Sequence, residues 1–157
     1  MQKKNNTVIG IDINSDNIEI CNIVWGNSSY NLTFEHKSIE NYPDKYFDCI
    51  LSNQCLEHVH NCGYYLSETN RCLKNNGQLI ISIPNIVNLR NYNTKILQNY
   101  DIGCDHIHGW DAHTFVALLG SMGFKLNTCI HAEGIPFPTF KNKILKWITP
   151  LYLYKPL

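Results

Sequence analysis

The apolar residues of this chain fall into short runs and helically spaced sets, two patterns that predict strands and helices respectively. Runs or alternations of apolar residues predict strands at residues 7–13, 32–36, 46–52, 79–83 and 124–131. Helical spacing predicts helices over residues 63–73 and 111–122. A further helix is predicted to begin at a cap, Ser15 or Asp16, with apolar positions at Ile18, Ile20 and Ile23. Because buried strands joined by helices pair in parallel, this order predicts an α/β fold with an open, mostly parallel sheet.

The middle of the chain carries the clearest version of this pattern. The apolar runs 49–51 and 79–83 are typical of strands that are buried on both faces. Asn76-Gly77 is a turn signal that we expect to end the helix between them, with the glycine supplying a positive φ. Ligands of open α/β sheets bind beyond the carboxyl ends of the strands, which here are Ser52-Asn53 and Pro84-Asn85.

The bulk composition narrows the class of protein. With 157 residues, of which 44% are hydrophobic and 17% charged, the chain suits one globular domain over residues 1–157. Lys+Arg 13 balance Asp+Glu 13, so the basic excess of a dedicated nucleic-acid binder is absent. No apolar run approaches the roughly 20 residues of a membrane span and the N-terminus is polar, so we expect a cytoplasmic protein. The 7 cysteines form no C-x-x-C pair, which disfavours a zinc site or a disulfide framework.

Two segments fall outside the regular pattern. Residues 86–110 are rich in Asn, Tyr and His, and we expect a cap or insert over a pocket mouth. Residues 141–157 form a basic-aromatic tail with helically spaced apolar residues, which suits either a membrane surface or packing on the sheet. Because Pro150 would break that helix and leave it short, we favour packing within the protein and expect no membrane association.

Several short motifs occur along the chain in a fixed order. They are Phe47-Asp48, Leu56-Glu57-His58, Arg71 to Gly77, Pro84-Asn85, the run 106–110 and Gly123-Phe124. Over most of residues 8–131 the chain resembles the class I S-adenosylmethionine-dependent methyltransferases of the small-molecule type. The resemblance implies a Rossmann-like sheet, S-adenosyl-L-methionine as cofactor and a small-molecule or sugar-type methyl acceptor. The order and spacing of the motifs indicate the family and leave the substrate open.

The resemblance also implies cofactor contacts at three strand ends. Asp12, followed by Ile13, stands where the family has an acidic residue that holds the cofactor ribose, and the alternative is an Asp that caps the next helix. Ser38 and Ile39 match a pair that contacts the adenine, although Ser38 replaces the usual acid. Ser52, Asn53 and Cys55 match the edge that lines the methionine end of the cofactor and the entry of the substrate.

Histidines are the candidate catalytic groups. Methyl transfer depends mainly on positioning, so a base is optional, and His58 and His108 are the candidates. The alternative for both is a structural, packed imidazole. Some relatives bind a divalent metal through a Glu-x-x-Glu-His sequence at this point, but here Gln54 replaces the first Glu. Because a neutral amide is a poorer ligand and no third ligand is evident beside the pair His106 and His108, we predict no metal.

The largest departure from the family lies at the front of the chain. The family begins with a strand and a glycine-rich turn, roughly Asp-x-Gly-x-Gly-x-Gly, that holds the amino-acid end of the cofactor. Seven residues precede Val8 and none is Gly, so we expect a sheet without its leading strand–helix unit. A gene fragment, a divergent pseudoenzyme and a chain completed by another polypeptide all fit this.

Two classes of function therefore remain. The first is methyl transfer from S-adenosylmethionine to a small-molecule substrate. The alternative is a catalytically inactive, truncated methyltransferase-like domain for binding or scaffolding. A dinucleotide oxidoreductase is disfavoured, because no G-x-G-x-x-G follows any predicted strand. The sequence leaves the oligomeric state open.

Overall fold

A computed structural model describes residues 6–26, 31–84, 106–130 and 152–156. The chain divides into two compact units, Met1–Pro43 and Asp44–Leu157, and each is described by itself. The single domain expected over residues 1–157 stays a prediction. No helix within the described ranges is long and apolar enough to cross a membrane.

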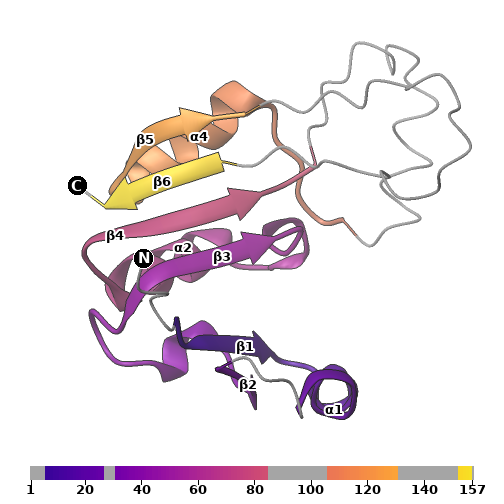
Figure 1. Cartoon of the computed structure of the whole chain (residues 1–157). Helices are drawn as coiled ribbons and strands as arrows, with labels where there is room; N and C mark the ends of the chain where they lie inside the picture. Colours follow the sequence, from indigo (N-terminus) through magenta and orange to yellow (C-terminus); the bar gives the residue numbers. More distant parts are fainter. Residues whose placement is uncertain (1–5, 27–30, 85–105, 131–151, 157) are drawn as a thin grey trace, which may run out of the picture. The chain divides into compact units, whose positions relative to one another are not determined.

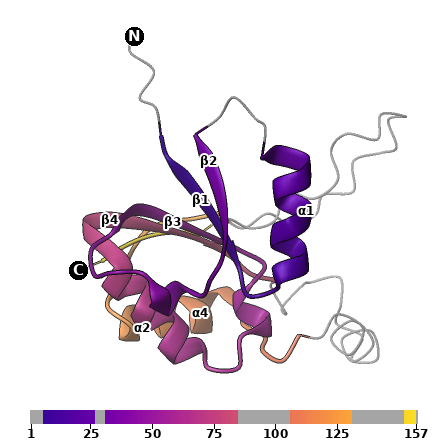
Figure 2. The ribbon, with the colours of Figure 1, turned by 90° about the horizontal axis from the view of Figure 1, so that it is seen from below.

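The first unit is a pair of strands with a helix alongside (Figure 2). Strands β1 (Val8–Asp12) and β2 (Leu32–His36) pair in parallel, with Asp12 opposite His36. Helix α1 (Ser15–Trp25) connects them, and a 3-10 helix, η1 (Ile39–Asn41), follows β2. Both predicted strands are confirmed. β2 has the predicted bounds, and β1 lies within the predicted range 7–13.

Two details predicted for α1 are wrong. The N-cap is Asn14, whose side chain accepts a hydrogen bond from the Asp16 N–H at 2.9 Å, so neither Ser15 nor Asp16 is the cap. Of the three isoleucines only Ile18 is buried, whereas Ile20 and Ile23 are 58% and 74% exposed. At about 100° per residue, positions 18 and 20 lie on nearly opposite sides of a helix, so they cannot share a buried face.

The second unit is a four-stranded sheet in the order β3-β4-β6-β5 (Figure 1). Its elements in chain order are β3 (Phe47–Asn53), the 3-10 helix η2 (Leu56–His58), α2 (Cys62–Cys72), β4 (Leu73–Ser82), α4 (Ala112–Ser121), β5 (Phe124–Cys129) and β6 (Tyr152–Pro156). β3 and β4 run parallel, as predicted, and β6 runs antiparallel to both of its neighbours.

The end of the predicted tail is a strand within this sheet. β6 pairs with β4 through Leu79 opposite Tyr154 and with β5 through Phe124 opposite Pro156. This pairing agrees with the expectation that the tail packs within the protein. The helically spaced residues 144–151 lie outside the described residues, as do residues 86–105 of the predicted cap.

The junction of α2 and β4 differs from the prediction. α2 ends at Cys72, and Leu73 is already extended. The residue with positive φ is Asn76, at 62°, and it lies inside β4 instead of ending the helix. There Lys74 to Gly77 lie opposite Asp48 alone, because Phe47 pairs with Leu73 and Cys49 with Gln78. Such a bulge accommodates extra residues on one strand, and Asn tolerates the left-handed conformation better than most residues.

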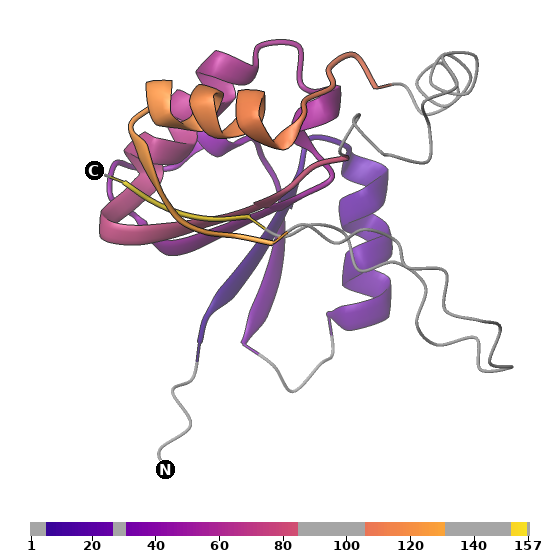
Figure 3. The same cartoon turned by 90° about the horizontal axis from the view of Figure 1, so that it is seen from above.

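The core of the second unit lies between the sheet and two helices. Figure 3 shows α2 and α4 on the same face of the sheet. The leucine, isoleucine and phenylalanine side chains with 0% exposure are Leu56, Leu66, Leu79, Ile81, Phe115 and Leu119. Burying each contributes about 1.5–3 kcal/mol. α4 lies within the predicted range 111–122; Asp111 is its N-cap, and Gly123, at φ 85°, follows its end.

The prediction that both faces of β3 are buried is wrong. Ile50 and Ser52 face the helices, in register with Leu79 and Ile81. Leu51 is 66% exposed. Successive side chains of a strand point to opposite faces, and in this unit both helices cover the same face. An apolar run of three residues cannot distinguish a strand covered on one face from one covered on both.

Candidate functional site

The carboxyl ends of β3 and β4 meet, as the sequence predicts. Asn53 lies opposite Ser82, and the Ser82 hydroxyl donates a hydrogen bond to the Asn53 side-chain oxygen. The N–H of Gln54 donates to the Ser82 carbonyl oxygen at 3.0 Å. Gln54 itself has a φ of 50°, a left-handed turn that ends the strand. The two strand ends therefore form one polar edge.

Next to this edge Ser52 contacts Tyr65, a residue that the sequence did not single out. The Tyr65 hydroxyl donates a hydrogen bond to the Ser52 hydroxyl oxygen at 3.1 Å, and Ser52 is 4% exposed. Burial raises the pKa of Tyr65 to about 12, so its hydroxyl stays a donor at neutral pH. Cys55, half-buried, follows in the turn. The helical position of Tyr65 beside Leu66 was visible in the sequence, but its contact with Ser52 was not.

In the first unit Asp12 is engaged within its own turn. One carboxylate oxygen accepts from the Asn14 N–H at 2.8 Å, and the other accepts from the Asn17 side-chain amide at 2.9 Å. These bonds resemble the structural alternative considered for Asp12, although the cap of α1 is Asn14. Each oxygen keeps a second lone pair that a ribose hydroxyl could use. The neighbouring Ile13 is 78% exposed, and its carbonyl oxygen lies 2.9 Å from His36 Nε2.

Ser38 and Ile39 begin η1. The Ser38 hydroxyl donates to the carboxylate of Glu40, and the Ser38 N–H donates to the Asn41 side-chain oxygen at 3.1 Å. Ile39 is 4% exposed. The hydrogen bond from the Ser38 hydroxyl thus holds the carboxylate of Glu40 beside Ser38, the position where the family has an acidic residue. The adenine contacts proposed for this pair stay a prediction.

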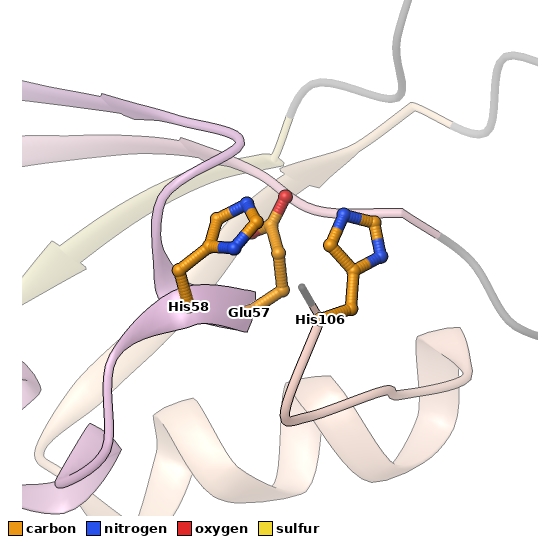
Figure 4. Close-up of side chains that lie close together, drawn as sticks. All are labelled: Glu57, His58 and His106. Carbon is orange, nitrogen blue, oxygen red and sulfur yellow. The ribbon is translucent and has the colours of Figure 1, made fainter. Parts of the chain in front are cut away.

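The second unit also joins three side chains with metal-ligand chemistry, shown in Figure 4. Glu57 and His58 come from η2, and His106 comes from the segment before α4. One ligand atom from each residue lies within 4.8 Å of the others, and the two imidazole centroids are 4.9 Å apart. Glu57 is 1% exposed, and neither of its carboxylate oxygens has a hydrogen-bond partner.

Backbone contacts hold this cluster together. The carbonyl oxygen of Glu57 accepts hydrogen bonds from the N–H groups of Ile107 at 3.0 Å and His108 at 3.2 Å. These bonds fasten the segment before α4 to η2, and the buried Leu56 anchors η2 in the core. Burial raises the pKa of Glu57, while a positive charge on His58 or His106 would lower it.

The two predicted catalytic histidines are separated by this arrangement. His58 is exposed and belongs to the cluster, whereas His108 stacks on Trp110 with ring centroids 5.4 Å apart. The Nε2 atom of His108 is buried without a hydrogen-bond partner. The stacking agrees with the structural alternative for His108. His106 takes its place in the cluster, which sequence spacing alone could not show.

A cavity of about 410 Å³ lies elsewhere in the second unit, at the amino end of β4. Most of its charged residues are already paired, because Arg71 contacts Asp44 and Glu68, and Lys74 contacts Asp48. The carboxyl edge, with its unpaired buried groups, is therefore the better candidate for chemistry.

A family model described as a methyltransferase domain matches residues 1–128. The chain belongs to this methyltransferase domain family. The methyltransferase-domain chain is 30% identical over 108 residues to the ubiquinone biosynthesis O-methyltransferase of Pelagibacter ubique. That match covers 66% of this chain and 41% of the relative, so the chain spans about two fifths of the curated relatives that it matches.

Solved structures resemble the methyltransferase-domain chain over nearly its whole length. A putative methyltransferase from Bacillus halodurans matches with a TM-score of 0.70 and 18% identity, covering 96% of this chain and 83% of the other. A protein described as an S-adenosylmethionine-dependent methyltransferase, from Methanosarcina mazei, matches with a TM-score of 0.69 and 16% identity, covering 98% and 84%. The likeness confirms the predicted Rossmann-like α/β fold.

Proposed function

We propose that this chain binds S-adenosyl-L-methionine and transfers its methyl group to an oxygen of a small molecule. The methyltransferase-domain match over residues 1–128 carries the proposal. Relatives named O-methyltransferases support an oxygen acceptor. The meeting of polar groups at the carboxyl ends of β3 and β4 also supports it, because open α/β sheets bind ligands at that edge.

The proposed cofactor contacts are those that the family resemblance implies for each unit. Asp12 accepts hydrogen bonds from the ribose hydroxyls, with Ile13 beside it, and Ser38 and Ile39 contact the adenine. In the second unit Ser52, Asn53 and Cys55 line the methionine end. Asp12 and Ser38 already make local hydrogen bonds, so they are held in place before a ligand arrives.

The bound cofactor supplies a methyl group on a positively charged sulfur. The protein then has to align an acceptor oxygen with that carbon, exclude water and receive the hydroxyl proton. An imidazole can accept a proton near neutral pH. His58 is the better placed of the two predicted bases, because His108 is stacked on Trp110.

Calorimetry with S-adenosylhomocysteine tests the cofactor proposal without requiring turnover. We expect saturable binding to the full chain, lost in Asp12→Ala and kept in Asp16→Ala, since Asp16 is an exposed acid of the same turn. Transfer of labelled methyl from S-adenosylmethionine to a simple catechol then tests the reaction. If the folded full chain binds neither S-adenosylmethionine nor S-adenosylhomocysteine, the proposal is overturned.

A second candidate is a binding domain without turnover. The observation that favours it is the local engagement of both oxygens of Asp12, which is also what a purely structural carboxylate would show. Saturable S-adenosylhomocysteine binding without methyl transfer to phenolic or sugar hydroxyls would support this candidate. The cytoplasmic location stays a prediction.

A further inference from the structure

The cavity of about 410 Å³ in the second unit lies away from the proposed cofactor edge. Its walls are the residues before β3, the second half of α2 and the start of β4. Because β3 and β4 run parallel and the cavity lies at the amino end of β4, it is at the opposite end of these strands from Asn53 and Ser82. Ligand sites in proteins have volumes of roughly 300–1,000 Å³, so this cavity is large enough for a small molecule.

The charged residues of the lining favour an anion. Three cations and one acid line the cavity: Lys45, Arg71, Lys74 and Asp44. The acid is already held by Arg71, at 2.6 Å. Lys74 contacts Asp48 outside the lining, but both side chains of that pair are exposed, by 46% and 86%, and exposed ion pairs contribute little to stability. Lys45 has no acidic partner among the described residues.

Four side chains of the lining have polar groups that a ligand can use. Within the part of the chain that the structure describes, no hydrogen bond or ion pair engages the side chains of Lys45, Ser67, Asn75 and Asn76. All four can donate a hydrogen bond, and none is an acid. A phosphate group has three terminal oxygens and a charge of about −1.5 to −2 at neutral pH, so it is a strong acceptor for such donors. A cationic ligand would find only the acid that Arg71 already holds.

The backbone gives a second, independent indication. Among the described residues, three that are not glycine have a left-handed φ: Lys45, Gln54 and Asn76. Gln54 lies at the carboxyl edge, whereas Lys45, at φ 54°, and Asn76, at φ 62°, both line this cavity. Such conformations are unfavourable for residues with a side chain, and they gather at binding sites. The Lys45 N–H donates to the Arg71 carbonyl oxygen at 2.9 Å, which holds this wall against the end of α2.

We propose that this cavity binds a small polar molecule that carries a phosphate group. The phosphate oxygens accept hydrogen bonds from the ammonium group of Lys45 and from the side-chain amides of Asn75 and Asn76. Lys74 can turn from the exposed Asp48 to the phosphate and supply a second positive charge. The site is separate from the proposed cofactor edge, so the inference does not depend on methyl transfer.

Calorimetry of the full chain with glucose 6-phosphate tests the site, with glucose as the neutral comparison and glucuronate as the carboxylate comparison. We expect saturable binding of glucose 6-phosphate, at least tenfold tighter than that of either comparison sugar. Lys45→Met and Asn75→Ala should each weaken it at least fivefold. Lys125→Met, which removes an exposed lysine of β5 outside the cavity, should bind as the unchanged chain does. Circular dichroism establishes that each variant is folded.

Repeating the titration with S-adenosylhomocysteine present shows where the phosphate binds. We expect the affinity for glucose 6-phosphate to stay the same, because the two sites lie at opposite ends of the strands. Competition between the two ligands would place the phosphate at the cofactor edge and overturn the inference. Equal binding by Lys45→Met and Lys125→Met, glucuronate binding as tight as that of glucose 6-phosphate, or no saturable binding would also overturn it. S-adenosylhomocysteine binding measured by itself reports on the proposed function separately.

Discussion

Two carboxylates, one in each unit, stand in opposite environments. Asp12 is partly exposed, and each of its oxygens accepts a hydrogen bond from its own turn. Glu57 is buried, and neither of its oxygens has a partner. The exposed group can be satisfied by neighbours and water, whereas the buried group has no hydrogen-bond partner. The burial of Glu57 therefore carries a desolvation cost that the partly exposed Asp12 avoids.

The largest expected effect is on the free energy of unfolding, when core positions of the two units are compared. Phe115 is fully buried and its ring packs 5.6 Å from Trp110, so Phe115→Ala should lower the free energy of unfolding by about 3–5 kcal/mol. Ile20 in the first unit is 58% exposed, so Ile20→Ala should cost less than about 0.5 kcal/mol. Urea denaturation measures both. An equal loss of free energy of unfolding in both variants would show that the side chain of Ile20 belongs to a buried core in the first unit.

Removing the buried carboxylate should stabilise the chain. Glu57→Met replaces two unpaired oxygens by an apolar group of similar length and should raise the free energy of unfolding by about 1–3 kcal/mol. The matched change Glu68→Met removes one of the two acidic partners of Arg71 and should lower the free energy of unfolding by up to about 1 kcal/mol. Urea denaturation checks both. Destabilisation by Glu57→Met would mean that the carboxylate has a protein partner.

Asp12→Ala should show a smaller, local effect. The turn before α1 loses two hydrogen bonds, so the free energy of unfolding should fall by about 1 kcal/mol. Asp12→Asn keeps an acceptor for the Asn14 N–H and should recover much of this. Thermal denaturation followed by circular dichroism compares the two. If S-adenosylhomocysteine affinity follows stability in both variants, Asp12 has only the structural role.

The smallest expected effects are on the stability of the fold at acid pH. The hydrogen bond from Lys37, with that from Tyr42, lowers the pKa of Glu35 from its ordinary value of 4.5. The backbone hydrogen bond from Thr114 likewise lowers the pKa of Asp111 from 3.8. A lowered pKa means that the stabilisation is complete above the ordinary value and is lost as the pH falls through the lowered one. Glu35→Gln and Asp111→Asn should therefore each flatten the acid limb of stability against pH, measured by urea denaturation between neutral pH and the acid limb.

Local patterns in the sequence predicted much of the fold. The strand Leu32–His36 has its predicted bounds, and the helix Ala112–Ser121 lies within the predicted range 111–122. Both depend on spacings within a few residues, which the chain itself specifies. The cap of α1 and the end of α2 were misplaced because neighbouring polar residues offer similar signals.

The candidate site was likewise predictable from the sequence only in part. Ser52, Asn53 and Ser82 could be expected together, because parallel strands bring their carboxyl ends to one edge. The contact of Tyr65 with Ser52 depends on how α2 packs against β3, which spacing along one helix does not specify.

By itself the sequence determined the family of this chain, its α/β order and the polar ends of its strands. Only the tertiary structure decided that Tyr152–Pro156 enters the sheet between β4 and β5, and that His106 lies beside Glu57 and His58. The physical reason is that periodicity records which face of an element is buried. Which distant segments then meet depends on packing and on the closure of long loops, and neither leaves a local pattern.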